Sequence, residues 1–137
     1  MTQRIIQPPA WPRPLGYSNG IIGTGATLFL AGQIGWDATT GRLAQGLPAQ
    51  VEQALRNIVA ILSEANAAPT NVVRMTWFVT DMEQYRSSGK AIGQSYRTVM
   101  GKHFPTMSVI GVASLVERDA LVEIEATALL DGAPSHG

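Results

Sequence analysis

The stretch Val72–Thr80, VVRMTWFVT, constrains the fold more than any other part of the chain. Its β-branched and aromatic residues predict a β-strand, and successive side chains of a strand point to opposite faces of a sheet. Large apolar side chains are expected on both faces, with Val73, Met75, Trp77 and Val79 on one and Val72 and Phe78 on the other. A sheet with two apolar faces must be covered on both sides.

Two amphipathic helices are predicted, one before and one after this strand. The first begins at Pro48 and runs for about five turns, because apolar residues recur at helical spacing. These residues are Val51, Ala54, Leu55, Ile58, Leu62 and Ala65. Asp81 is expected to cap the second helix, and Gly101 to end it. The apolar face of the second helix comprises Tyr85, Ile92, Tyr96, Val99 and Met100.

Four further strands complete the predicted layout. A GTGA turn signal separates Gly20–Ile22 from Thr27–Gly35, so a β-hairpin is expected there. Met107–Leu115 and Ala120–Leu130 supply two more strands. The order β-β-α-β-α-β-β predicts an α+β fold with both helices on one face of a mixed sheet. We expect a second copy of the chain to cover the other face, which makes the protein a homo-oligomer.

The length of 137 residues fits a single domain spanning residues 1–137. Residues 1–14 contain PPAWPRP, whose prolines cannot pair as a central strand. We therefore expect an extended proline-rich arm, with the folded core beginning near Leu15. Residues 131–137 are expected to form a frayed tail.

Composition narrows the possible functions. Ten basic and ten acidic side chains cancel, and without a run of Lys or Arg nucleic acid is not expected as the main partner. The absence of cysteine excludes disulfides and thiolate chemistry, and with two histidines no metal site is expected. No apolar run is long enough to cross a membrane, and the first residues lack a signal-peptide core, so a cytoplasmic location is expected.

Six segments together carry a family resemblance: GYSNGI, LFLAGQIGWD, GLPAQVEQALRNIVAIL, VVRMTWFVTD, FPTMS and ALVEIEATA. From about Leu15 to Leu130 the chain resembles the RidA (YjgF) family of small reactive-intermediate deaminases. The resemblance implies a chorismate-mutase-like α+β fold, a homotrimer, and ligand clefts between neighbouring subunits. It also implies hydrolysis of enamines and imines derived from amino acids, which releases ammonia and a keto acid without a cofactor.

The same resemblance implies roles for individual residues. Tyr17 matches the pocket tyrosine of the family, and Glu123 matches the glutamate thought to hold the attacking water. Met107 stands where the family usually has an arginine that grips the substrate carboxylate. Gly93 replaces a frequent asparagine, and Ala31 replaces the serine of the usual SGQ sequence.

These three replacements remove polar atoms and leave two interpretations. A hydrogen bond to a charged group contributes roughly 1.5 to 3 kcal/mol, which a thioether cannot supply. Met107 could therefore indicate a roomier, less polar pocket for a substrate without an anchoring carboxylate. Alternatively, Met107 packs in the core or an interface of a protein that has lost the chemistry. Further candidates for the substrate-binding cleft are Gly32, Gln33 and Trp36.

Two other polar residues have more ordinary interpretations. Glu125 is predicted to share a strand face with Glu123 at about 7 Å, where a second carboxylate could assist acid–base chemistry, although such a pair more often forms a solvated face. His103 is expected to cap a helix end. Two functions remain: an imine or enamine hydrolase that uses Glu123 and Tyr17, or a non-catalytic trimer that binds a small metabolite or a protein.

Overall fold

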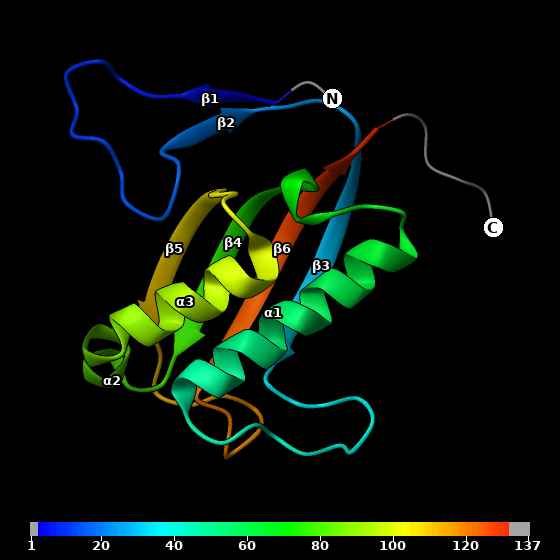
Figure 1. The fold of residues 1–137 in the computed structure, drawn as a ribbon, viewed down its shortest axis with the longest axis vertical. Coiled ribbons are helices and arrows are strands. Elements are labelled where there is room, and N and C mark those ends of the chain that lie inside the picture. Colours follow the sequence, from blue (N-terminus) through cyan, green and yellow to red (C-terminus); the bar gives the residue numbers. More distant parts are fainter. Residues whose placement is uncertain (1–2, 132–137) are drawn as a thin grey trace.

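The computed structural model describes residues 3–131, which form a sheet with helices packed against one face (Figure 1). The strands are β1 (Arg4–Ile6), β2 (Gly20–Ile22), β3 (Ala26–Ile34), β4 (Val72–Val79), β5 (Thr106–Gly111) and β6 (Val122–Leu130). The helices are α1 (Leu47–Glu64), α2 (Met82–Ser87) and α3 (Gly89–Met100), and a 3-10 turn, η1 (Pro69–Asn71), leads into β4. Apart from Asp131, the predicted tail lies outside the described residues.

Four strands form the main sheet in the order β3-β6-β4-β5, and β1 and β2 form a separate two-stranded sheet. β6 is antiparallel to both of its neighbours, whereas β4 and β5 are parallel. Parallel neighbours need a crossover connection, and here α2 and α3 provide it. The predicted α+β architecture with a mixed sheet is confirmed.

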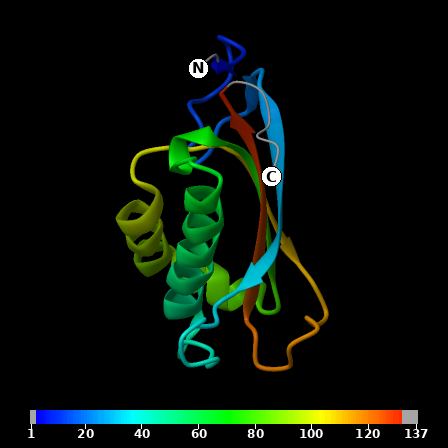
Figure 2. The same cartoon turned by 90° about the vertical axis from the view of Figure 1, so that its right-hand side faces the viewer.

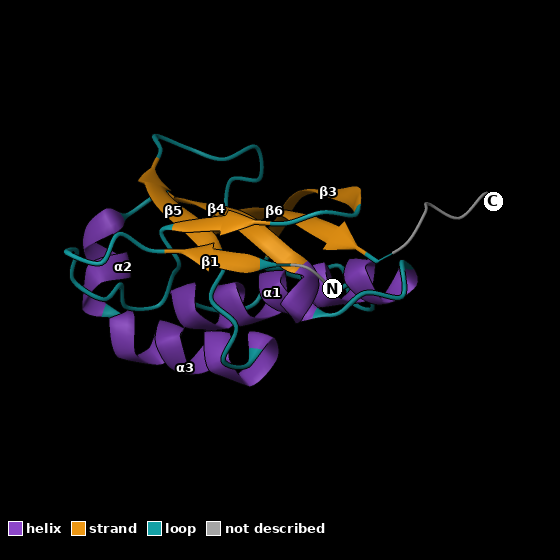
Figure 3. Ribbon diagram, turned by 90° about the horizontal axis from the view of Figure 1, so that it is seen from above, coloured by secondary structure: helices purple, strands orange, loops and turns teal. Residues whose placement is uncertain are grey.

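The helix layer covers one face of the sheet, and the opposite face carries no helix (Figures 2 and 3). α1 has Pro48 in its first turn, where the missing backbone N–H removes no helical hydrogen bond. The apolar stripe of α1 is buried as predicted: Val51, Ala54, Leu55, Ile58 and Leu62. The observed bounds differ from the predicted ones by one residue at each end.

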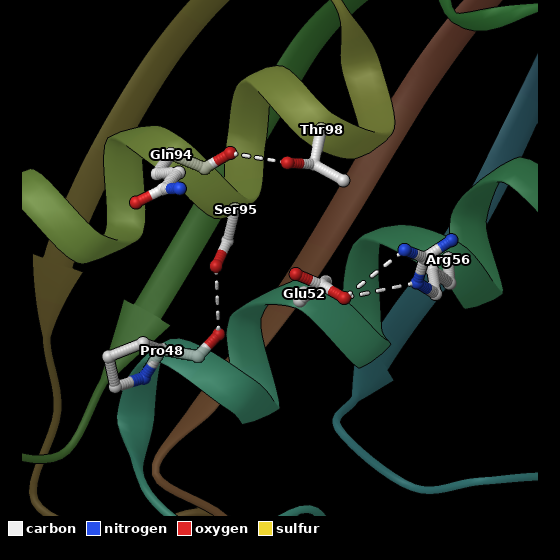
Figure 4. Close-up of polar contacts among 6 residues, drawn as sticks. All are labelled: Pro48, Glu52, Arg56, Gln94, Ser95 and Thr98. Atoms are coloured by element: carbon white, nitrogen blue, oxygen red, sulfur yellow. Dashed lines mark hydrogen bonds and ion pairs between the residues drawn. The ribbon is translucent and has the colours of Figure 1, made fainter.

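Polar contacts contribute little to the packing of this layer (Figure 4). Between the helices, the hydroxyl of Ser95 on α3 donates to the carbonyl oxygen of Pro48 on α1 at 3.4 Å. Arg56 and Glu52 form an ion pair along α1 at 3.1 Å, but both side chains are exposed to solvent. Exposed pairs of this kind contribute about 0 to 1 kcal/mol, so apolar burial holds the helices on the sheet.

The second predicted helix is in fact two helices, α2 and α3, which break at Ser88. Asp81 caps α2 as predicted, with its carboxylate accepting from the backbone N–H of Gln84 at 3.0 Å. The break falls at a Ser-Ser-Gly sequence, and glycine is a poor helix former. Gly101 ends α3 as predicted, with a φ of 70° that glycine adopts without strain.

The predicted hairpin between β2 and β3 is wrong, because β2 pairs with β1 and β3 pairs with β6. The arm that was expected to be extended contributes a strand, Arg4–Ile6. Gly25 explains the change of partner. Its φ is 134°, and a Cβ at this position would lie 2.1 Å from the carbonyl oxygen of Leu130. The GTGA segment thus carries the chain past the end of β6 into the main sheet.

A bulge near the start of β4 changes which face its first residue occupies. The register with β6 shifts between Val72 and Arg74, and a bulge of one residue reverses the alternation of side chains. Val72 is consequently buried in the core with Met75 and Trp77. Its predicted place on the opposite face is wrong, and Arg74 and Phe78 remain on that side of β4.

We call the sheet surface away from the helices the outer face. The alternation predicted for β6 is confirmed, because Val122, Ile124, Ala126 and Ala128 are buried towards the helices. Glu123 and Glu125 are therefore on the outer face, where they are the cross-strand neighbours of Phe78 and Thr76. Phe29 on β3 is 79% exposed and Ile110 on β5 is 44% exposed, so the outer face keeps apolar surface that the chain itself does not cover.

Candidate functional site

Tyr17 lies in the loop between β1 and β2 and is 41% exposed. The next residue, Ser18, is buried and attaches this loop to the beginning of β5. The backbone N–H of Ser18 donates to the carbonyl oxygen of Pro105 at 3.0 Å, and the hydroxyl of Ser18 donates to the carbonyl oxygen of Phe104 at 2.6 Å. Ser18 and Thr106 also form a parallel bridge. The structure thus brings Tyr17 close to the edge strand that carries Met107.

Met107 is half-buried and packs against the hydrophobic core. Its neighbour in the parallel register is Met75 on β4, which is fully buried. Adjacent residues in register share a face of the sheet, so Met107 lies on the helix-covered face. This position supports the interpretation that Met107 is a packing residue.

Glu123 is held on the outer face directly over the backbone of Gly32. A Cβ at Gly32 would lie 2.6 Å from Oε2 of Glu123 and 2.8 Å from its Cγ. β3 also has an irregular register between Leu30 and Gln33, where Ala31 and Gly32 are exposed. A glycine at position 32 therefore leaves the space that the carboxylate occupies, so the structure brings Gly32 and Glu123 together. Gln33 instead pairs in register with Ile124, which is buried towards the helices.

The carboxylate of Glu123 has no hydrogen-bond or ion-pair partner within residues 3–131, although the residue is half-buried. Gln33, which pairs in register with Ile124, donates from Nε2 to the carbonyl oxygen of Ala31 at 3.2 Å. An ionised carboxylate accepts hydrogen bonds only. Glu123 is therefore available to accept from a water molecule or from a ligand.

Glu125 shares the outer face with Glu123 but has different surroundings. It borders a hollow of about 230 Å³ together with Phe29, Arg74 and Thr127. Glu123 does not line this hollow. The predicted common face is confirmed, whereas a common cavity is not seen within one chain.

Gly93 and Trp36 belong to other parts of the fold than Tyr17, although Trp36 is only two residues beyond Ile34, which pairs in register with Glu123. Gly93 is on α3, in the helix layer, where an added Cβ would meet only Nη1 of Arg97 at 3.5 Å. Trp36 follows β3 and lines a cleft of about 840 Å³ near the start of α1. Gln50 supports this cleft, because its buried side-chain amide bonds to the backbone of Ala44, Asp119 and Leu121.

His103 does not cap α3. Its Nε2 lies 2.7 Å from the carbonyl oxygen of Val72 at the start of β4, because the chain turns back towards the sheet after Gly101. The hydroxyl of Tyr96 donates to the carbonyl oxygen of His103 at 2.5 Å, and burial raises the pKa of Tyr96. These contacts connect the end of α3 to the sheet and indicate a structural role.

A hollow beside Tyr17 was not anticipated from the sequence. It has a volume of about 430 Å³, and its lining includes Trp11, Arg13, Leu15, Tyr17 and Asn19. The sequence predicted an extended proline-rich arm, which gave no indication of a hollow. Arg13 precedes Tyr17 by four residues in WPRPLGY, and this spacing was the available signal that both residues belong to one loop.

Over residues 3–131, no group of three or more His, Cys, Asp or Glu side chains could hold a metal ion. In the same range, no helix is long and apolar enough to cross a membrane.

Comparison with known proteins places this geometry in a family. The family model described as Endoribonuclease L-PSP matches residues 11–130. A RutC family protein of Synechocystis is 36% identical over 132 residues, covering 95% of this chain and 98% of that protein. The human 2-iminobutanoate/2-iminopropanoate deaminase is 30% identical over 131 residues, covering 94% of this chain and 91% of that protein.

A solved structure gives the same result for the fold. The Rid family protein YyfB from Yersinia pestis, described as of unknown function, superimposes with a TM-score of 0.83 at 35% identity, covering 95% of this chain and 100% of that one. The chain therefore belongs to the RidA/YjgF/UK114 family, whose model is described as Endoribonuclease L-PSP.

Proposed function

We propose that the protein hydrolyses a small imine or enamine, with Glu123 positioning the attacking water. The observation that carries this proposal is the carboxylate of Glu123, which is held over Gly32 without a partner in the described chain. A relative of similar length, the human protein, is named for its action on 2-iminobutanoate and 2-iminopropanoate. Tyr17 is proposed to orient the ligand or to donate a proton.

The proposed reaction needs only water and one carboxylate. Glu123 accepts a proton as the water oxygen attacks the carbon of the C=N bond and passes this proton to the nitrogen, which gives a carbinolamine. Glu123 then takes the proton of the carbinolamine hydroxyl and passes it to the amine nitrogen, so the carbonyl forms as the C–N bond breaks and ammonia leaves. The carboxylate is regenerated, and a positioned acid or base of this kind contributes roughly 10²- to 10⁴-fold to a rate.

The distance between Glu123 and Tyr17 supports a cleft that is assembled from more than one chain. Ser18 is attached to Thr106, which neighbours Arg74 at the start of β4. Glu123 neighbours Phe78 near the end of β4. The four residue steps from Arg74 to Phe78 span about 13 Å at the rise of a strand. One chain therefore keeps the two side chains apart, and we propose that a neighbouring copy in a homotrimer brings a Tyr17 to each Glu123.

We also propose that Met107 replaces the carboxylate-binding arginine of the family. Packing of Met107 against the core is compatible with a non-catalytic, ligand-binding member of the family, which is the alternative function. Both possibilities predict an assembled protein, and they differ in whether ammonia is released.

Ammonia release from freshly generated 2-iminopropanoate and 2-iminobutanoate tests the proposal. Glu123→Gln is nearly isosteric and should lower the rate about 100-fold or more while the oligomeric mass stays unchanged. Glu125→Gln makes the same change on the same strand face and should retain the activity. Equal rates for wild type and Glu123→Gln would remove Glu123 from the mechanism. Failure of a broad imine panel with wild type would favour the binding function.

A further inference from the structure

We propose that the hollow beside Tyr17 binds the carboxylate of a small organic acid through Arg13. Arg13, Trp11, Tyr17 and Asn19 all line this hollow of about 430 Å³. They offer a cation, two aromatic rings and an amide within one loop. Only the use of this ligand in turnover rests on the proposed hydrolytic function, because binding itself needs no chemistry.

The charge of the lining distinguishes this hollow from the two others described above. The cleft of about 840 Å³ has two carboxylates beside its single arginine, and the hollow of about 230 Å³ has one carboxylate beside its arginine. The hollow beside Tyr17 has Arg13 as its only charged side chain. It is therefore the one of the three whose lining favours an anion over a neutral or cationic ligand.

Arg13 is not engaged elsewhere in the described chain. Within residues 3–131 the recorded ion pairs of arginine are those of Arg56 and Arg86, with Glu52 and Glu83. A guanidinium presents a planar set of donors that matches the two oxygens of a carboxylate. The rings of Trp11 and Tyr17 can contact the apolar part of the same ligand, so a short-chain carboxylate fits better than an inorganic anion.

The loop that carries these side chains is held in place by hydrogen bonds. Nδ2 of Asn19 donates to Oε1 of Gln7 at 2.6 Å, which closes the loop at its two ends. Nε2 of Gln7 donates to the carbonyl oxygen of Pro12 at 3.3 Å, and the backbone N–H of Trp11 donates to that of Pro8 at 3.1 Å. Arg13 therefore projects from a folded loop, which lowers the entropic cost of binding.

The attachment of this loop also places Arg13 near the edge strand β5 of the main sheet. Ser18 fixes the loop to the backbone of Phe104 and Pro105, immediately before Met107 in the sequence. The proposed carboxylate site thus lies at the same edge of the molecule as the residue that replaces the family arginine. Arg13 can supply from the loop the positive charge that Met107 cannot supply from β5.

Calorimetric titration of the full-length assembled protein with 2-oxobutyrate and with its uncharged methyl ester tests the proposal. Arg13→Gln should weaken binding of 2-oxobutyrate about tenfold, since a factor of ten is 1.4 kcal/mol and hydrogen bonds to charged groups reach that value. Binding of the ester should be unchanged. Arg4→Gln is the matched control, because Arg4 is an exposed arginine of the same arm that does not line the hollow.

Three results would overturn the proposal. The first is the absence of saturable 2-oxobutyrate binding by wild type, and the second is equal affinity of wild type and Arg13→Gln. The third is an equal loss in Arg4→Gln, which would indicate a general effect of net charge. The ammonia assay tests the proposed function separately. Activity that depends on Glu123 but not on Arg13 would support the proposed hydrolysis and reject the Arg13 site. Binding of 2-oxobutyrate that depends on Arg13, without any ammonia release, would support the Arg13 site and reject the proposed hydrolysis.

Discussion

The two faces of the main sheet differ in how completely a single chain covers them. On the helix-covered face, Leu55 and Ile124 are 0% exposed. On the outer face, Phe29 remains 79% exposed, and Glu123 has no partner in the described chain. β6 contributes to both faces through alternate residues. One side of the same strands therefore packs into the core, whereas the other side keeps apolar and carboxylate groups that the described chain does not cover.

The largest effect is expected on the helix-covered face. Leu55→Ala should lower the free energy of unfolding by about 2 to 5 kcal/mol, because it removes buried methyl groups and leaves a cavity. Chemical denaturation monitored by circular dichroism measures this. A loss below about 1 kcal/mol would show that α1 contributes less to the fold than its burial indicates.

The matched change on the outer face is Phe29→Ala. Its side chain is exposed within one chain, so its removal should leave the secondary structure intact and weaken assembly instead. Light scattering should then report a shift of mass towards the single chain of 14.6 kDa. If the wild-type protein is already a stable monomer, the proposed difference between the two faces is wrong, because the outer face then needs no cover.

Met107→Arg separates the two interpretations of Met107. Because this residue packs against the core, a longer charged side chain should destabilise the protein by about 1 to 3 kcal/mol without changing the affinity for 2-oxobutyrate. Thermal unfolding and calorimetric titration provide the two measurements. Unchanged stability together with tighter 2-oxobutyrate binding would instead place Met107 in the ligand cleft.

Gly32→Ala should have the smallest effect on stability and a selective effect on activity. The new Cβ would occupy the space of the Glu123 side chain, and the half-buried carboxylate can rotate away at little cost. Displacement of the proposed catalytic carboxylate should lower the rate by about tenfold or more. Gly89→Ala, which adds the same methyl group where nothing lies within 4 Å, is the control and should keep the rate. Full ammonia-releasing activity in Gly32→Ala would show that the position of the carboxylate is not critical.

Local periodicity was enough to predict the parts of the fold that a single segment determines. The apolar spacing of α1 and the alternation in β6 both depend on residues within one element. The partner of β2 could not be predicted in this way, because strand pairing joins distant segments and depends on the close passage at Gly25. The bulge before Arg74 also escaped prediction, since simple alternation assumes one residue per step.

The candidate site was predictable only in part. The pattern of β6 placed Glu123 on the face opposite the core, and the structure added its contact with Gly32. The separation of Tyr17 from Glu123 along β4 depends on strand register, which the sequence does not display. The place of Arg13 in a hollow could not be predicted, because the prolines indicate only what the arm cannot form. The hydrogen bonds that fold the loop join positions up to 12 residues apart.

The attachment of the loop by Ser18 affects which substitutions the loop can accept during evolution. Both acceptors of Ser18 are backbone carbonyl oxygens, which any residue provides, and the tip of the loop contributes nothing to the buried core. Substitutions at Trp11, Arg13 or Leu15 should therefore cost little in folding while they alter the walls of the hollow. A family with one conserved scaffold could acquire new ligand preferences by varying this loop alone.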